Sequence, residues 1–283
     1  MALRTDLAIE NSNLNLGDLP KGVSYEKKTQ ENITIEVLKI DDDNASLKMS
    51  KPIGTYITAT VPEFSGNISI SEDETALLAE YLRGLLPENG TVLVVGLGNI
   101  HITPDAIGPR AVDLILATRH MTEIALKPLE GFRSVAAIAT GVLGQTGVET
   151  AEIILSIINE IKPKAIIAID ALAAASVTRL GTTVQISNSG ITPGAGVQNR
   201  RKELSEKTLG IPVVAIGVPT VVDSDTIINE MSSCSPSAKN EPLMVTPRDI
   251  DLLIERSAKV ISMIINLALQ KGFTQEDIKY LTC

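Results

Sequence analysis

The chain has 283 residues, of which 44% are hydrophobic, and it carries a net charge of −9 with only three Phe, four Tyr and no Trp. Few aromatic side chains are available to stack on bases, and the negative charge repels phosphate, so the composition argues against a nucleic-acid-binding protein. No segment has the apolar length of a membrane span or the apolar core of a signal peptide. We therefore expect one large domain, or one domain with an appendage, in the cytoplasm and without a membrane partner.

The N-terminal quarter is expected to form an antiparallel β appendage. Residues 1–30 are polar and show only weak patterning. β-branched and partly alternating residues then predict three strands, at 33–40, 45–49 and 55–61. These strands would form a meander ahead of the main sheet.

A helix is predicted to begin after this meander, at Ser71. Ser71 and Glu74 have the spacing of a capping box, in which each side chain binds the other residue's backbone N–H. Leu78 and Leu82 lie one turn apart and give the helix an apolar face, and the polar turn at 87–90 ends it.

Short apolar strands alternate with helical segments from Val92 onward. The strands are predicted at 92–96, 134–138, 164–169, 182–187 and 212–216, and the helices near 109–120, 148–161 and 200–208. Such alternation is typical of an α/β fold, a mostly parallel sheet with helices on both faces. The chain then divides into residues 7–70, with the meander, and an α/β core at 71–283, expected to be continuous with it.

The C-terminal part is predicted to begin with a polar loop at 231–242. A long helix follows, which Thr246 would cap, and which would end near Gln270. Pro247 would occupy its first turn, where the missing N–H costs nothing. Thr274 is expected to cap a last short helix.

Two aspartates stand at equivalent places, each after an apolar strand. Asp105 follows the strand at 92–96, and Asp170 closes the strand at 164–169. Ligands bind at the carboxyl ends of such strands, so the two acids are candidates for a functional carboxylate pair. Asp105 can equally be read as the N-cap of the helix that Gly108 opens. Asp170 is harder to explain structurally, because an acid within an apolar run needs a partner or a proton.

Several polar, glycine-containing loops follow other strands and are expected to support the site. Their glycines would let an extended peptide approach the backbone, although ordinary strand-to-helix connections explain them too. The auxiliary candidates are Gly98, Asn99, Gly141, Ser187, Gly190, Gly194 and Asp223, of which Asp223 is most simply a cap or a supporting partner.

His101 is the one histidine near a candidate acid. It stands where a dinucleotide-binding fingerprint would need a third glycine, which weakens that interpretation of the Gly96–Gly98 turn. A zinc site normally needs more nitrogen or sulfur ligands than this chain offers. We expect no cofactor, and a set of Asp105, Asp170 and His101 remains the alternative as metal ligands.

A group of motifs spread over most of the chain resembles one family. The matching segments are Val95-Gly96-Leu97-Gly98-Asn99, Thr103-Pro104-Asp105-Ala106, Ala168-Ile169-Asp170-Ala171-Leu172, Gln185-Ile186-Ser187, Ala215-Ile216-Gly217-Val218-Pro219-Thr220 and Met244-Val245-Thr246-Pro247. Together they resemble the germination proteases of endospore-forming bacteria, endopeptidases that degrade small acid-soluble spore proteins. That family is distantly similar to the hydrogenase-maturation endopeptidases, which implies a fold of that type, also described as phosphorylase/hydrolase-like.

The resemblance also implies a catalytic mechanism, an oligomeric state and processing from a zymogen. It implies an aspartic-type endopeptidase that uses Asp105 and Asp170, since no histidine stands near Gly190 where the hydrogenase-maturation relatives bind metal. It further implies a homotetrameric zymogen of the spore core that cuts itself near its N-terminus. The acid–apolar pair Asp6–Leu7 matches the family's preference for cutting after an acid, so residues 1–6 would be a short propeptide.

Two other functions remain open at this point. One is a metal-dependent endopeptidase that uses the same acids as ligands, and the other is a non-catalytic peptide-binding module. The sequence does not assign the roles of acid and base within the pair, because two coupled carboxyl groups titrate as a unit.

Overall fold

The computed structural model describes residues 5–10, 17–124, 131–194, 201–231 and 243–282. Within these residues nine strands form one sheet in the order β1-β2-β3-β7-β8-β6-β4-β5, with β9 paired to β8. The strands are β1 (Val23–Gln30), β2 (Ile33–Ile40), β3 (Gly54–Thr60), β4 (Val92–Gly96), β5 (Val135–Ala139), β6 (Ala165–Ala174), β7 (Thr183–Ser187), β8 (Val213–Asp223) and β9 (Met244–Val245). The helices are α1 (Asp43–Met49), α2 (Glu72–Gly84), α3 (Ile107–Val112), α4 (Arg119–Ile124), α5 (Leu143–Thr146), α6 (Thr150–Ile161), α7 (Glu206–Leu209), α8 (Ser224–Met231), α9 (Ile250–Leu269) and α10 (Gln275–Thr282).

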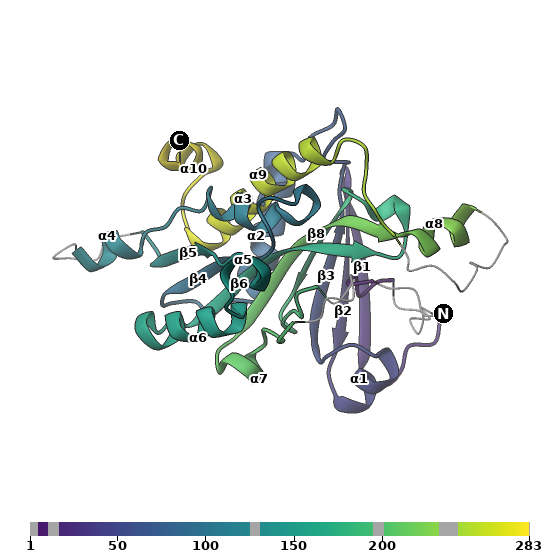
Figure 1. Cartoon of the computed structure of the whole chain (residues 1–283), viewed down its shortest axis with the longest axis horizontal. Coiled ribbons are helices and arrows are strands. Elements are labelled where there is room, and N and C mark those ends of the chain that lie inside the picture. The colour runs from purple at the N-terminus through teal and green to yellow at the C-terminus, as the bar shows by residue number, and fades with distance from the viewer. Residues whose placement is uncertain (1–4, 11–16, 125–130, 195–200, 232–242, 283) are drawn as a thin grey trace.

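The sheet has a parallel core and an antiparallel N-terminal part. β5, β4, β6 and β8 lie side by side and run parallel. β7 runs antiparallel to both β8 and β3, and β3 continues into β2 and β1. The predicted α/β class with an antiparallel N-terminal part is confirmed. The meander extends the main sheet through the β3–β7 pairing instead of forming a separate layer (Figure 1).

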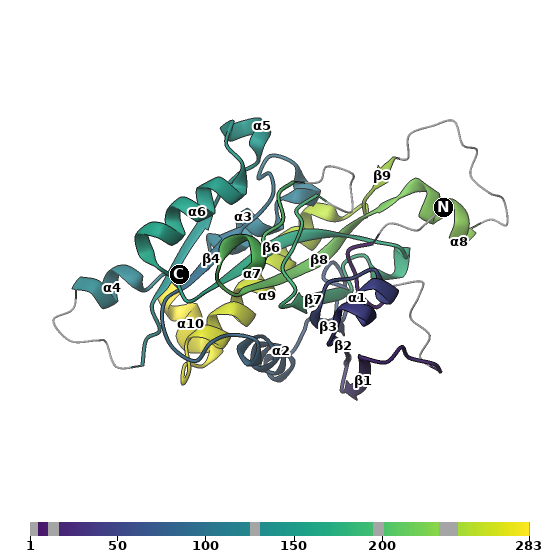
Figure 2. The same cartoon turned by 90° about the horizontal axis from the view of Figure 1, so that it is seen from below.

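Helices cover both faces of the parallel core (Figure 2). On one face, α2, α3 and α9 pack on Val94 and Ile167. On the other, α6 packs on Leu93 and Ile166. Because neighbouring residues of a strand point to opposite faces, a wholly apolar strand fills both layers, as the sequence pattern predicts.

The N-terminal region differs from the prediction in two places. Residues 45–49 belong to helix α1, which the Asp42 side chain caps by accepting from the Ala45 N–H at 2.8 Å. Ala45 and Met49 are both buried, whereas Leu47, midway between them, is 80% exposed. In a strand all three would share one face, so this burial fits a helix and not a strand. Strand β1 was not predicted, because all its side chains are at least partly exposed and an edge strand of this kind has no apolar alternation.

The main sheet also departs from the predicted element ends. β6 and β8 run on to Ala174 and Asp223, well beyond the predicted ends. The helix predicted at 109–120 is divided into α3 and α4, and the helix predicted at 200–208 is the short α7.

The helix ends give mixed results. The capping box of Ser71 and Glu74 is confirmed, and Thr274 binds the Asp277 N–H at the start of α10. Thr246 does not cap the long helix, since α9 begins at Ile250 and the Thr246 hydroxyl donates to the Thr220 carbonyl oxygen. Most of the loop predicted at 231–242 lies outside the described residues. Among the helices that the structure does describe, none has the length and apolar character to cross a membrane.

Candidate active site

A step in the sheet creates the candidate site. β4 ends at Gly96, which pairs with Ile169 of β6, whereas β6 continues to Ala174. The Leu97 N–H makes one more bond, to the Ile169 carbonyl oxygen at 2.8 Å, and the chain then turns away. Asp170 is therefore inside a strand instead of just past its end, at the point where β6 loses its neighbour β4. From there onward one edge of β6 faces a cavity.

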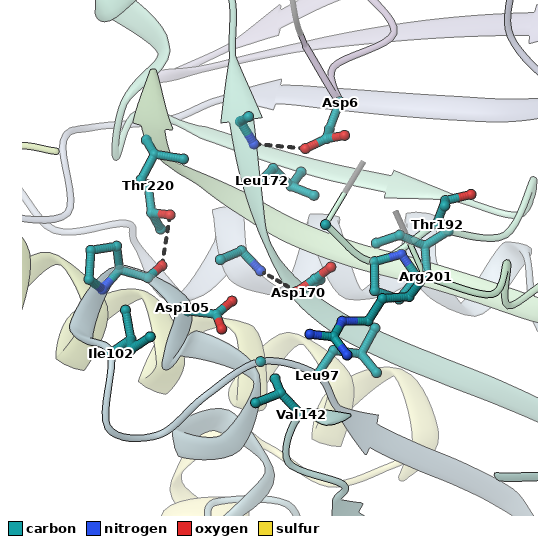
Figure 3. Close-up of a pocket in the computed structure, with 18 of the residues that line it drawn as sticks. Asp6, Leu97, Ile102, Asp105, Val142, Asp170, Leu172, Thr192, Arg201 and Thr220 are labelled. Carbon is teal, nitrogen blue, oxygen red and sulfur yellow. Dashed lines mark hydrogen bonds between the residues drawn. The ribbon is translucent and has the colours of Figure 1, made fainter. Parts of the chain in front are cut away.

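The cavity has a volume of about 320 Å³ and collects acids from three separate segments. Asp6 from the N-terminal segment, Asp105 from the loop after β4 and Asp170 from β6 all line it (Figure 3). Arg201 is the one basic residue among the lining residues. The other walls of the cavity combine apolar and hydroxyl side chains, which include Leu97, Ile102, Val142, Thr150, Leu172, Ile191, Thr192, Thr220 and Thr246.

The loop after β4 holds Asp105 in place. Asp105 ends the 3₁₀ turn Thr103–Asp105, and its Oδ2 accepts from the Asn99 N–H at 2.7 Å. Gly98 has φ of +107°, and a Cβ there would lie 2.0 Å from the Asp105 carbonyl oxygen. Only glycine fits this position, so the turn fixes where Asp105 can lie.

The N-cap interpretation of Asp105 is wrong. Ala106 occupies the N-cap position of α3, and no side chain caps that helix. The Asp105 carboxylate points into the cavity instead (Figure 3). Desolvation raises its pKa, and the Asn99 N–H and the Arg201 charge offset part of that rise.

Asp170 is the more deeply buried acid of the pair, at 6% exposure. Its Oδ1 accepts from the Ala171 N–H at 3.0 Å. Desolvation raises the pKa of Asp170 well above its ordinary value, and the nearby charges of Asp105 and Asp6 raise it further. An acid in these surroundings keeps its proton far more easily than one in water.

The N-terminal segment lies along the free edge of β6. The Asp6 N–H donates to the Ala173 carbonyl oxygen at 2.9 Å, and the Ala173 N–H donates to the Asp6 carboxylate at 2.8 Å. Leu7 is completely buried in an apolar cluster with Leu172, Ala174 and Val222. Asp6 and Leu7 are thus held beside the cavity that contains the two candidate catalytic acids.

The auxiliary candidates separate into four groups. Gly98, Gly141 and Gly194 line the cavity, whereas Ser187 and Gly190 line a neighbouring cavity of about 200 Å³ that shares Asp6 with it. Asn99 supports the site from behind, since its backbone binds Asp105 and its side-chain oxygen accepts from Gln145 at 2.7 Å. Asp223 caps α8 through the Thr226 N–H at 2.7 Å and does not line either cavity.

His101 is not brought to the two aspartates. It is exposed, and its N–H donates to the Asn99 side chain at 3.0 Å. Within the described ranges, no three His, Cys, Asp or Glu side chains are grouped closely enough to hold a metal ion. The alternative ligand set of Asp105, Asp170 and His101 is therefore not assembled.

Sequence reasoning missed three polar residues of this region, namely Lys51, Gln185 and Arg201. Gln185 had a usable signal, because it alternates with Thr183 and Ser187 on one face of a strand that is buried throughout. A polar face on a buried strand indicates a polar site or a binding groove. Lys51 and Arg201 lie in loops and carry no comparable pattern.

Known proteins are similar to this chain over most of its length. The family model for the germination proteases matches residues 5–234. Germination proteases from Clostridium tetani and from Caldanaerobacter subterraneus are each 42% identical to this chain, over 98% and 99% of it respectively and 98% of their own length. The one from Priestia megaterium is also 42% identical, over 81% of this chain and 66% of its own.

A solved structure gives a more distant match. A [NiFe] hydrogenase maturation protease from Thermococcus kodakarensis is 19% identical, with a TM-score of 0.38 over 65% of this chain and 98% of its own. The sequence matches extend over almost the whole length of the chain and reach well above 30% identity. The chain belongs to the germination protease family and is an endopeptidase.

Proposed function

We propose that this endopeptidase starts the degradation of small acid-soluble spore proteins by cutting after an acidic residue and before an apolar one. Asp105 and Asp170 would activate the attacking water. The observation that carries this proposal is that the two carboxyl groups share one cavity, at the step where β6 loses β4 as its neighbour. The family resemblance supports the choice of substrate, and the docked pair Asp6–Leu7 provides an acid–apolar sequence within this chain.

The proposed chemistry follows from the unequal surroundings of the two acids. Two carboxylates that sense each other's charge do not both ionise readily, so the pair holds one proton. Asp170 is the favoured site for that proton, because burial raises its pKa and the charge of Asp105 raises it further. Asp105, which binds the Asn99 N–H and faces Arg201, is the favoured base.

Each proton then has a defined route. Ionised Asp105 would take a proton from water as the water oxygen bonds to the peptide carbonyl carbon. Protonated Asp170 would donate to the nitrogen of the leaving amine as the C–N bond breaks. The water is thereby divided between the new carboxyl group and the new amine, and the pair is left with one proton, as it began.

The proposal includes self-processing. The chain would be made as a zymogen in the spore core, as a homotetramer, and residues 1–6 would be released by a cut at Asp6–Leu7. Burial of Leu7 on the cluster of Leu172, Ala174 and Val222 supports a specific docked position for this bond.

The test compares three single variants with the unaltered chain. Asp105→Asn and Asp170→Asn are each incubated with a small acid-soluble spore protein, and cleavage is followed by mass spectrometry. We expect cleavage to fall by about 1000-fold or more in both, because each loses a proton-transfer group. Asp223→Asn is the matched control, since Asp223 is a similarly buried acid whose role as a helix cap asparagine can also fill. Full activity in either site variant would remove that residue from the mechanism.

A further inference from the structure

The free edge of β6 holds the chain's own N-terminal segment, whose Asp6 N–H donates to the Ala173 carbonyl oxygen at 2.9 Å. Backbone N–H groups of β6 and of the residue after it bind the side chains of two acids in that segment. Ala173 donates to Asp6 at 2.8 Å, and Ala175 donates to Glu10 at 2.7 Å. The other oxygen of Glu10 is buried without a hydrogen-bond partner. This edge therefore binds a segment through two of its acids, Asp6 and Glu10.

Gln185 acts on this segment as a peptide group would. Its Oε1 accepts from the Ala8 N–H at 2.7 Å, and its Nε2 donates to the Asp6 carbonyl oxygen at 3.1 Å. Both partners are main-chain atoms, two residues apart, which is the spacing that a neighbouring β-strand uses. Such bonds do not depend on the side chains of the segment, so Gln185 fixes the register of whatever strand lies there.

Lys51 supplies positive charge on the same side. Its Nζ donates to the Asp6 carbonyl oxygen at 3.2 Å and to the Thr5 carbonyl oxygen at 3.4 Å. Burial lowers the pKa of Lys51, and the charges of Asp6 and Glu10 act in the opposite direction. The ammonium group thus stands close to both acids of the segment. The smaller cavity of about 200 Å³, which Lys51 and Gln185 both line, opens beside them.

These contacts converge on one atom, the carbonyl oxygen of Asp6. It receives a donor from Lys51 and another from Gln185, and it belongs to the Asp6–Leu7 bond. A group that only anchored the segment could bind at any point along it. Two donors on this one oxygen instead fix the position of the bond that lies between the acid and the apolar residue.

We propose that Lys51 and Gln185 form the recognition clamp for substrate strands, in which Lys51 selects acidic residues and Gln185 sets the register. This inference rests on the proposed function, because it assumes that a substrate takes the place of residues 5–10 once the cut has released residues 1–6 and residues 7–10 have moved out of the site. The occupant is an extended peptide with an acid before the cut and a second acid four residues further on. The two residues have different tasks, so their variants should fail in different ways.

The experiment uses the full chain and two peptides. One peptide carries the sequence of residues 5–10, Thr-Asp-Leu-Ala-Ile-Glu, within flanking residues, and the other has Asn and Gln in place of the two acids. The chain is first incubated to allow self-processing, and kcat/KM is then measured for both peptides with the unaltered chain, Lys51→Met, Lys51→Arg and Gln185→Leu. Lys39→Met is the matched control, because Lys39 is an exposed lysine on β2.

Each variant has its own expected signature. Lys51→Met should reduce the preference for the acidic peptide over the amide peptide by about tenfold or more, because the positive charge that interacts with both acids is lost. Lys51→Arg keeps the charge and should keep the preference. Gln185→Leu should lower kcat/KM for both peptides by similar factors and leave their ratio unchanged. Lys39→Met should change neither rate.

Two results would overturn the inference. One is a Lys51→Met variant that slows both peptides equally, since Lys51 would then be a structural residue. The other is a Gln185→Leu variant that leaves both rates unchanged.

If the unaltered chain cleaves neither peptide, the proposed function fails, and the clamp is then judged by hydrogen exchange of the Ala8 amide. Exchange should be about tenfold faster or more in both Lys51→Met and Gln185→Leu, and unchanged exchange would refute the clamp.

Discussion

Replacing Asp170 by asparagine should make the protein more stable at neutral pH while it abolishes peptide cleavage. The pKa of Asp170 is raised in the folded chain, chiefly by burial and then by the charges of Asp105 and Asp6. The folded chain therefore binds more protons than the unfolded chain between the ordinary pKa of 3.8 and the raised value. Stability is lost as the pH rises through that window, and the full penalty applies above it.

The size of the effect follows from what asparagine keeps and removes. Its side-chain oxygen can still accept from the Ala171 N–H, as the Asp170 oxygen does at 3.0 Å. Its NH₂ group can donate toward the Asp105 carboxylate. In the unaltered chain, the negative charge of ionised Asp170 is instead repelled by that of Asp105. Removing the cost of burying an ionisable group is worth about 1–3 kcal/mol. At roughly 2 °C per kcal/mol for a chain of this size, the unfolding midpoint should rise by about 2–6 °C.

The assay is thermal unfolding followed by far-ultraviolet circular dichroism at several values between pH 4 and pH 8. The gain in midpoint of Asp170→Asn over the unaltered chain should be largest at pH 8 and should shrink toward pH 4. Asp223→Asn is the control and should show no such dependence, because asparagine can accept the same hydrogen bond from the Thr226 N–H. A midpoint for Asp170→Asn below that of the unaltered chain at pH 8 would refute this reasoning, since it would mean that ionised Asp170 is favourably paired.

Two further variants test the parts that position the site. Gly98→Ala places a methyl group 2.0 Å from the Asp105 carbonyl oxygen at φ of +107°, so the loop must move and kcat/KM should fall by about 100-fold while far-ultraviolet circular dichroism stays unchanged. Unchanged kcat/KM would show that Gly98 does not set the position of Asp105. Leu7→Ala removes the buried anchor of the N-terminal segment at a cost of about 2–5 kcal/mol. Hydrogen exchange of the Ala173 amide should then be faster by about 30-fold or more. Retained protection of that amide would mean that the hydrogen bonds of Asp6 hold the segment without Leu7.

The parallel core of the fold was predictable because its strands are apolar on both faces. The strand predicted at 92–96 has the bounds of β4, and the capping box at Ser71 marks the start of α2. The meander was harder, because α1 is a short helix whose cap, Asp42, looks like part of a turn. In such a short segment, apolar residues four apart fit a helix and a strand equally well, because they share one face in both.

The sequence predicted the acids of the site, but not the other polar side chains that line it or contact the N-terminal segment. Asp170 was recognisable because a carboxyl group within an apolar strand is costly to bury unless it is paired or protonated. The sequence placed it at a strand end, yet β6 continues for four more residues, because pairing with β8 sustains a strand that has lost β4. The contribution of Lys51 depends on where a loop meets the N-terminal segment. Such a contact between distant parts of the chain leaves no local pattern to detect.

The step between β4 and β6 has a consequence for the shape that a target must have before it can be cut. A strand edge offers N–H and C=O groups at the spacing of extended chain, and a helix has already used its own groups internally. A helical target would therefore present no free N–H to the Ala173 carbonyl oxygen, which accepts from the Asp6 N–H here. If the proposed function holds, cleavage at this edge should depend first on the conformation of the target and then on its sequence. The N-terminal segment, whose Asp6 N–H binds the Ala173 carbonyl oxygen, also covers this edge against pairing with a neighbouring molecule.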